Sequence, residues 1–162
     1  MIERIKTLPS DESVLMYIIL AGTNDLGSIF LNIFLLAFDS MKRIKVSLQA
    51  EQIFSNLKQM QTFVVNEKKF KCCFISLPEL GIERMKQGKE IKEKRENLND
   101  LVSKFCLENS ENTRFVDITK TLPMNSLSLE ERKKIWCDEI HFTPLGYDTL
   151  AEEVFKVISD WI

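Results

Sequence analysis

The sequence predicts an α/β fold, a three-layer αβα sandwich built around a parallel sheet. Three short apolar segments typical of strands, residues 14–20, 71–77 and 115–118, are separated by longer segments whose apolar residues recur at helical spacing. Such regular alternation of strand and helix is characteristic of parallel sheets whose crossovers are helices. The last 20 residues repeat the helical spacing and predict a terminal helix.

The first strand and the segments after it follow from simple patterns. Residues 14–20 are all apolar and stop before Gly22, which predicts a strand buried on both faces of the sheet. Residues 71–77 form a second apolar run, closed by Pro78. Between them, residues 44–65 predict an amphipathic helix, with apolar positions at Ile44, Leu48, Ile53, Leu57, Met60 and Val64.

The second half of the chain predicts three helices around the third strand. Residues 86–107 keep an apolar stripe beneath many charges, and the charge run 89–96 is interpreted as a solvated face. Ser128 stands three residues before Glu131, the capping-box spacing, and opens a short helix. Thr143 and Pro144 predict the start of the terminal helix, whose expected buried stripe is Leu150, Ala151, Val154, Val157, Ile158 and Trp161.

Composition restricts the class of protein. With 162 residues and 44% hydrophobic content, the chain suits one domain, residues 1–162, with its own core. The 22 basic and 24 acidic residues give a net charge of −2, which favours neither nucleic acid nor an anionic membrane as partner. The expected partner is a small neutral molecule.

The cysteines and the N-terminus predict a cytoplasmic protein. Cys72, Cys73, Cys106 and Cys137 lack metal-site spacing and are expected to be reduced thiols in the core. The N-terminal residues lack the layout of a signal peptide, and the longest apolar run, 14–21, is far shorter than the roughly 20 residues that span a bilayer. We therefore expect no membrane span.

Two loops carry residues suited to chemistry. Residues 22–27 follow the first strand, and ligands of parallel sheets bind beyond the carboxyl ends of strands. There a glycine permits close backbone approach, and the Asn24 amide offers donors to an oxyanion. The alternative is a plain turn, because Asn, Asp and Gly are ordinary turn residues.

The second loop contains the chain's only histidine, His141, three residues after Asp138. A carboxylate that accepts from one imidazole nitrogen fixes the tautomer and frees the other nitrogen to act as a base. The alternative is a histidine that merely satisfies its hydrogen bonds at a helix N-terminus.

Together these loops resemble the SGNH hydrolase family, also called GDSL-type lipases and esterases. Residues 22–25, Gly-Thr-Asn-Asp, match one family block, and residues 138–141, Asp-Glu-Ile-His, followed by Phe-Thr-Pro and Gly-Tyr, match another. The resemblance implies a flavodoxin-like fold and hydrolysis of small carboxylic esters without metal or cofactor. By position it implies that Asn24 and Gly22 form the oxyanion hole, that His141 is the general base and that Asp138 orients it.

The chain departs from the family at the nucleophile. The family's Gly-Asp-Ser block precedes the Gly-x-Asn-Asp block, but only 21 residues precede Gly22 here and none is glycine. Ser10 and Ser13 flank acidic residues ahead of a strand, which is typical of a loop. Cys137 is adjacent to Asp138, but adjacency does not place its thiol against the outward imidazole nitrogen. Ser40 follows an aspartate but lacks the glycine, so it is a poor match. The nucleophile stays unknown, with Ser40 as the candidate, and little activity is expected of this chain.

Two further expectations follow from this departure. The resemblance implies that about three of the family's strands are present and that the chain is its C-terminal portion. Strand 14–20 would then be an uncharged exposed edge, which invites pairing with an upstream segment, a partner strand or a second copy.

The rival hypothesis is a non-catalytic α/β binding or scaffold domain. A nucleotide-binding domain is disfavoured because no glycine-rich phosphate loop is present. The apolar segment 28–41 is either a buried helix or part of an acyl pocket.

Overall fold

The computed structural model of the protein describes residues 7, 13–23, 25–26 and 49–161. Asn24, Ser10, Ser40 and the segment 28–41 lie outside these described residues. The described sheet has three parallel strands in the order β1-β2-β3, formed by Met16–Ile19, Lys71–Ile75 and Thr113–Val116. The predicted α/β fold with a parallel sheet is therefore confirmed.

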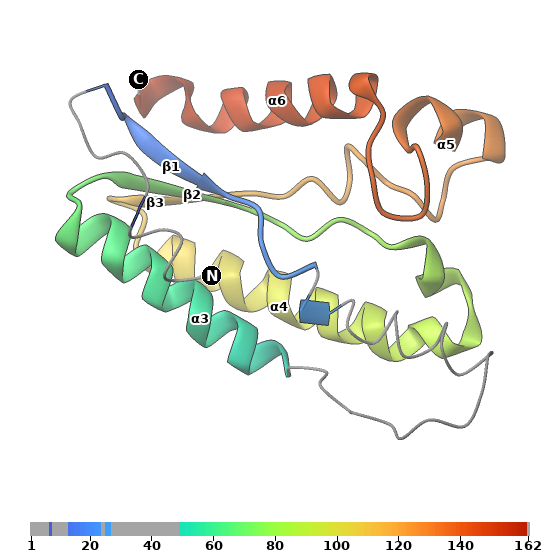
Figure 1. The fold of residues 1–162 in the computed structure, drawn as a ribbon, viewed down its shortest axis with the longest axis horizontal. Coiled ribbons are helices and arrows are strands. Elements are labelled where there is room, and N and C mark those ends of the chain that lie inside the picture. The colour runs from blue at the N-terminus through green and yellow to red at the C-terminus, as the bar shows by residue number, and fades with distance from the viewer. Residues whose placement is uncertain (1–6, 8–12, 24, 27–48, 162) are drawn as a thin grey trace.

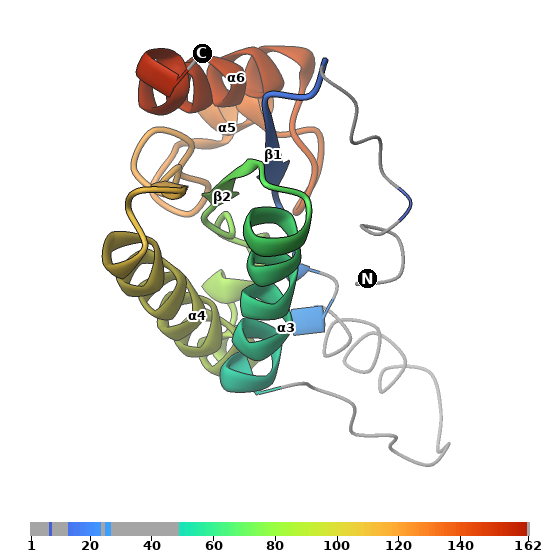
Figure 2. The ribbon, with the colours of Figure 1, turned by 90° about the vertical axis from the view of Figure 1, so that its left-hand side faces the viewer.

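Helices cover the two faces of the sheet in separate layers. In Figures 1 and 2, α3 (Ala50–Thr62) and α4 (Lys89–Glu108) lie on one face, and α5 (Leu129–Ile135) and α6 (Pro144–Ile158) lie on the other. Two clusters of buried apolar side chains match these layers. The cluster on the α3 and α4 face includes Cys72 and Phe74 of β2, and the cluster on the α6 face includes their neighbours Cys73 and Ile75.

The first strand is not buried on both faces, so that prediction was wrong. Tyr17 and Ile19 are buried in the cluster beneath α3 and α4. Ile18 and Leu20 are 50% and 41% exposed. The cause is the position of β1 at the edge of the described sheet, because the cluster that α6 joins is built mainly on β2 and β3.

The crossover helices agree with the predicted stripes. α3 buries Ile53, Leu57 and Met60 and continues as one π-helical turn, Phe63–Glu67. Residues 44–48 of that prediction lie outside the described part of the chain. The third strand begins at Thr113, two residues before the predicted start, in register with Cys72 of β2.

One residue of the charge run 89–96 is not solvated, which corrects the sequence interpretation. The Arg95 side chain is 3% exposed and the Glu83 side chain is 1% exposed. Arg95 Nε and Nη2 donate to the two Glu83 carboxylate oxygens over 2.7 and 2.9 Å. Arg95 lies on the same helix face as the buried Ile91 and Leu98, so it is buried with them. The ion pair with Glu83 offsets the free-energy cost of burying its charge.

The cysteine prediction holds for three of four thiols. Cys72, Cys73 and Cys106 are buried, and burial raises the pKa of Cys73 to about 11 and of Cys106 to about 12. Cys137 is exposed, which corrects its assignment to the core. It lies in the loop between α5 and α6, outside both packed layers. Of the described helices, none combines the length and the apolar character needed to cross a membrane.

Candidate active site

The loop between α5 and α6 carries Asp138 and His141, and it is closed at its base like a short hairpin. Trp136 and Phe142 form an isolated antiparallel bridge, and their rings lie 4.2 Å apart between centroids. The Cys137 amide donates to the His141 carbonyl over 2.8 Å. Trp136 and Phe142 are both buried, so the four residues from Asp138 to His141 project from a fixed base.

The start of α6 fixes the far end of this loop. The Thr143 hydroxyl caps the helix by accepting from the Gly146 amide over 3.1 Å, with Pro144 at the first helical position. The Thr143 amide donates to the Ile135 carbonyl at the end of α5 over 2.8 Å. A Cβ atom at Gly146 would lie 2.3 Å from that same carbonyl oxygen, which explains why a residue without a side chain stands there.

The Asp138 carboxylate is held by three donors from its own loop. One oxygen, Oδ1, accepts from the Ile140 and His141 amides, each over 2.7 Å. The other, Oδ2, lies 2.7 Å from Nδ1 of His141. The hydrogen bonds from the His141 side chain and backbone hold the pKa of Asp138 below its ordinary value of 3.8. Asp138 therefore stays ionised near neutral pH and favours the tautomer with the proton on Nδ1.

The pair is open to solvent within the described part of the chain. The side chains of His141 and Asp138 are 66% and 54% exposed. No described residue hydrogen-bonds to Nε2 of His141, so this nitrogen is available to accept a proton. An exposed imidazole of this kind suits a catalytic base, and it also suits a histidine that only caps the loop; contact between Nε2 and a substrate group distinguishes the two.

The first sequence block is only partly described. Gly22 has φ +114°, a conformation that side chains rarely adopt. A Cβ atom at Gly22 would lie 3.2 Å from Ile53 of α3 and 3.4 Å from Leu77 in the segment after β2. The Gly22 carbonyl accepts from the Leu26 amide over 3.0 Å. Gly22 thus has two structural reasons to be glycine, whatever it does in catalysis.

The described part of the first block and the loop with Asp138 and His141 lie at the same edge of the sheet. In Figure 1, the segment after β1 and the loop between α5 and α6 both lie beyond the carboxyl ends of the strands. The distance between Asn24 and His141 falls outside what the structure describes, because Asn24 is not among its described residues.

The Cys137 thiol is 3.2 Å from the Phe142 carbonyl oxygen and donates there rather than to His141.

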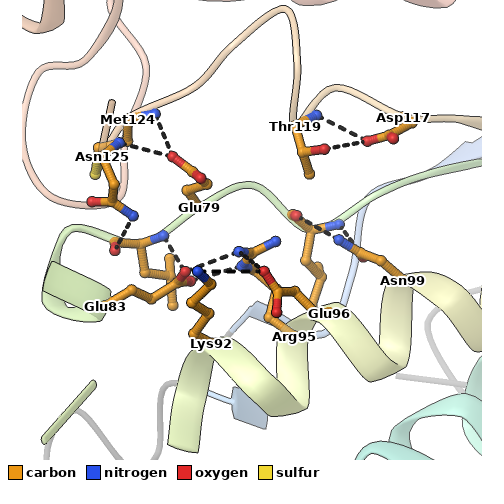
Figure 3. A network of polar contacts seen from close by, with 12 residues as sticks. Glu79, Glu83, Lys92, Arg95, Glu96, Asn99, Asp117, Thr119, Met124 and Asn125 are labelled. Atoms are coloured by element: carbon orange, nitrogen blue, oxygen red, sulfur yellow. Dashed lines mark hydrogen bonds and ion pairs between the residues drawn. The ribbon is translucent and has the colours of Figure 1, made fainter. Parts of the chain in front are cut away.

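The sequence patterns did not predict a polar network around the segment that follows β2. Figure 3 shows Glu79, which accepts from the Met124 and Asn125 amides over 2.7 and 2.8 Å, and Asn99, which bonds both backbone groups of Leu77. Polar residues directly after a strand were the available signal. A cavity of about 230 Å³ beside this network does not include Asp138 or His141; its lining is Glu79, Arg95, Glu96, Asn99, Asp100, Ser103, Phe115, Asp117 and Thr119.

No group of three or more His, Cys, Asp or Glu side chains in the described ranges could hold a metal ion.

The comparison with protein families gives one decisive match. The profile of the GDSL-like Lipase/Acylhydrolase family matches residues 2–154, almost the whole sequence.

This chain belongs to the GDSL-like lipase and acylhydrolase family. The resemblance inferred from residues 22–25 and 138–141 is thereby confirmed at the level of the family. No curated protein matched the sequence.

Solved structures agree with the GDSL assignment at the level of the fold. A GDSL-like lipase from Bacteroides thetaiotaomicron has TM-score 0.62 and 16% identity over 99% of this chain and 70% of its own. A member of the lipolytic G-D-S-L family from Veillonella parvula has TM-score 0.58 and 17% identity over 98% and 73%. A mutant acetyl-xylooligosaccharide esterase from Geobacillus Stearmophilus has TM-score 0.63 and 15% identity over 95% and 64%. At such identities the likeness concerns the fold, and this GDSL chain spans 64% to 73% of their lengths.

Proposed function

We propose that this GDSL family member acts on carboxylic esters of small molecules, with His141 as general base and Asp138 as the carboxylate that orients it. The observation that carries the proposal is the 2.7 Å contact between Asp138 Oδ2 and His141 Nδ1, with Oδ1 already engaged by two backbone amides. Nε2 makes no hydrogen bond with a described residue, and the His141 side chain is 66% exposed. Its loop lies at the carboxyl edge of the sheet, where ligands of parallel sheets bind.

The proposed reaction is acyl transfer through a hydroxyl nucleophile. As the hydroxyl oxygen bonds to the ester carbon, its proton passes to Nε2 of His141, and the imidazolium is stabilised by Asp138. The tetrahedral intermediate then collapses, the bond to the alcohol breaks, and the departing alcohol takes the proton from Nε2. Water repeats the sequence on the acyl-enzyme and releases the acid. No metal or cofactor takes part in this proposal.

The proposed oxyanion hole uses the Asn24 amide and the backbone of Gly22. Support comes from the buried position and the left-handed backbone conformation of Gly22, three residues after the end of β1. A donor contributes most when it is held in place before the charge develops, because no reorganisation is then needed. The nucleophile remains unassigned, with Ser40 as the candidate in this chain.

Turnover of a short activated ester such as p-nitrophenyl acetate tests the proposal. A short acyl group is the first choice because one similar structure is an acetyl-xylooligosaccharide esterase. His141→Ala is expected to lower kcat by several orders of magnitude, since the proton then has no acceptor. Glu152→Ala, at an exposed residue of α6, is the control and keeps full activity. Unchanged turnover in the His141→Ala variant would remove His141 from the mechanism.

A fluorophosphonate probe, which labels activated serine hydroxyls, locates the nucleophile. Labelling followed by peptide mapping is expected to mark one serine, and the label disappears in the His141→Ala variant because the serine is no longer activated. Ser40→Ala tests the named candidate directly. A chain that shows neither labelling nor turnover would favour the second candidate function.

The second candidate is a non-catalytic scaffold domain that pairs β1 with another chain or a second copy. The observation in its favour is the exposed apolar surface at β1, where Ile18 is 50% exposed and Leu15, the residue just before the strand, is 63% exposed. Edge strands that carry charges resist pairing, but residues 14–20 carry none. Antiparallel pairing of two copies through β1 would bury this surface without bringing like charges together.

Light scattering across a range of concentrations distinguishes this candidate from the first. The unmodified chain is expected to associate, and Ile18→Lys to remain monomeric because a charge then faces the paired edge. Leu107→Lys makes the same chemical change at a 78% exposed residue of α4 and leaves association unchanged. A monomeric parent chain would eliminate pairing through β1.

A cytoplasmic location is part of both proposals, supported by four free cysteines.

A further inference from the structure

The two residues between Asp138 and His141 contact a distant turn of the chain. Glu139 accepts from the Gly81 amide through its carbonyl over 3.0 Å, and its carboxylate lies 2.5 Å from Arg84 Nη2. Ile140 packs against the small cluster of Leu80, Ile82 and Ile91. Residues 80–84 form the 3-10 turn Gly81–Arg84 and its cap, which lies 55 residues away in sequence from the loop.

This turn is itself fixed to the rest of the molecule. Glu83, at its centre, bonds the Leu80 amide over 3.0 Å and forms the buried ion pair with Arg95 of α4, as Figure 3 shows. Arg84 Nε donates to the Gly81 carbonyl over 3.0 Å, which orients the guanidinium toward Glu139. The turn therefore offers a rigid surface rather than a flexible one.

The fit between turn and loop leaves no room for a side chain at Gly81. A Cβ atom there would lie 1.3 Å from Glu139 Oε2 and 2.9 Å from Glu139 Cβ. The φ of Gly81 does not lie in the left-handed region, so alanine suits the backbone there, and the three atoms nearest to its Cβ all belong to Glu139.

We infer that Glu139 and Ile140 are positioning residues, which dock the loop on the Gly81–Arg84 turn and thereby hold the carboxylate of Asp138 against Nδ1 of His141. The catalytic meaning of this inference rests on the proposed function. The docking is needed because Asp138 and His141 are each more than half exposed, and exposed pairs hold their geometry weakly by themselves. Three contacts restrict the residues between Asp138 and His141: the ion pair of Glu139 with Arg84, its hydrogen bond from the Gly81 amide, and the apolar packing of Ile140.

Because His141 is the only histidine, its imidazole gives a single, unambiguous set of nitrogen NMR signals. The neutral ring in the parent is expected to carry its proton on Nδ1, facing Asp138. Gly81→Ala, which displaces the Glu139 carboxylate without changing any charge, is expected to shift the ring toward the Nε2–H tautomer. It should also make the Ile140 and His141 amides exchange about tenfold faster, because their acceptor is no longer fixed.

Three further variants separate positioning from general destabilisation. Glu139→Ala is expected to act as Gly81→Ala does, while Glu139→Gln keeps an acceptor for Arg84 and restores most of the parent signals. Glu153→Ala removes a carboxylate from an ion pair of the same 2.5 Å length on α6 and leaves His141 unchanged. Each variant is compared only where its circular dichroism matches the parent, so that loss of folding is recognised.

The inference is overturned if folded Gly81→Ala and Glu139→Ala keep the parent tautomer and the parent amide exchange. It is supported further if Gly81→Ala lowers kcat for the ester and leaves KM unchanged, since only the base is misaligned. Failure of the proposed function is distinguishable, because the imidazole and amide signals are measured without substrate and do not require turnover.

Discussion

Asp138 uses its two carboxylate oxygens for different purposes. Oδ1 accepts two backbone amides and turns the chain, while Oδ2 meets the imidazole of His141. Only an ionised carboxylate can accept on both sides without donating, so asparagine would either lose the turn or present a donor to Nδ1. One residue thereby couples the shape of the loop to the protonation state of the ring.

The pH dependence of this residue follows from its lowered pKa. The His141 side chain and backbone hydrogen bonds hold the pKa of Asp138 below 3.8, whereas in the unfolded chain it titrates at that ordinary value. The stabilisation it provides is therefore fully present above the unfolded pKa and is lost as pH falls through the folded pKa. We expect carbon-detected NMR of the carboxyl group to show titration below pH 3.8.

His141→Ala is expected to move that titration back toward 3.8, because the first cause of the shift is removed. Asp160 provides the internal control in the same spectra. The hydrogen bond from Arg114 holds the pKa of Asp160 at about 2, and this pair lies at the other end of α6. Movement of both carboxyl groups, or of neither, would contradict the local origin assigned to the Asp138 shift.

α5 is the element that depends most on its cap. It has seven residues, none of them buried, so packing contributes little to its stability. Ser128 and Glu131 satisfy each other's amides in a capping box over 3.3 and 3.0 Å. The far end of α5 supports the loop between α5 and α6, since the Ile135 carbonyl accepts from the Thr143 amide.

Ser128→Ala is expected to lower the free energy of unfolding by about 1 kcal/mol, a typical value for loss of a serine cap. The effect should be strongest locally, as faster amide exchange over residues 129–135 measured by NMR. Ser126→Ala, at an exposed serine two residues earlier, is the matched control. Equal losses in both variants would show that the cap itself does not stabilise α5.

At the scale of the whole molecule, the segment that follows β2 joins both helical layers. Leu77 and Glu83 of this segment bond Asn99 and Arg95 of α4. Its Glu79 bonds the loop after β3, and its Gly81 and Arg84 bond the loop between α5 and α6. A disturbance within α4 can therefore reach a loop on the opposite face of the sheet through covalent and hydrogen-bonded contacts alone.

The buried pair of Arg95 and Glu83 is where that connection is most sensitive. Arg95→Met is expected to lower the free energy of unfolding by about 3–5 kcal/mol, because it leaves the Glu83 carboxylate buried and unpaired. Arg95→Met combined with Glu83→Leu is expected to recover most of that loss, apart from about 1 kcal/mol for the Leu80 amide. Urea unfolding followed by fluorescence of the buried Trp136 provides the measurement.

A double variant no more stable than Arg95→Met alone would contradict this explanation. It would mean that the arginine stabilises the fold by its volume and packing rather than by neutralising Glu83. Lys94→Met offers a comparison on the same helix, since Lys94 forms its 2.7 Å ion pair with the exposed Glu90 and should contribute at most about 1 kcal/mol.

The sequence by itself determined the order of the elements, the parallel sheet, the caps at Ser128 and Thr143, and the Asp138–His141 pair. These features depend on apolar periodicity and on hydrogen bonds between residues a few positions apart, which are readable along the chain. Only the tertiary structure decided that Arg95 is buried, that Ile18 is exposed, and that Glu139 docks on a turn 55 residues away. These features depend on how the helical layers pack on the sheet and bring segments distant in sequence together, and a local sequence pattern does not determine that packing.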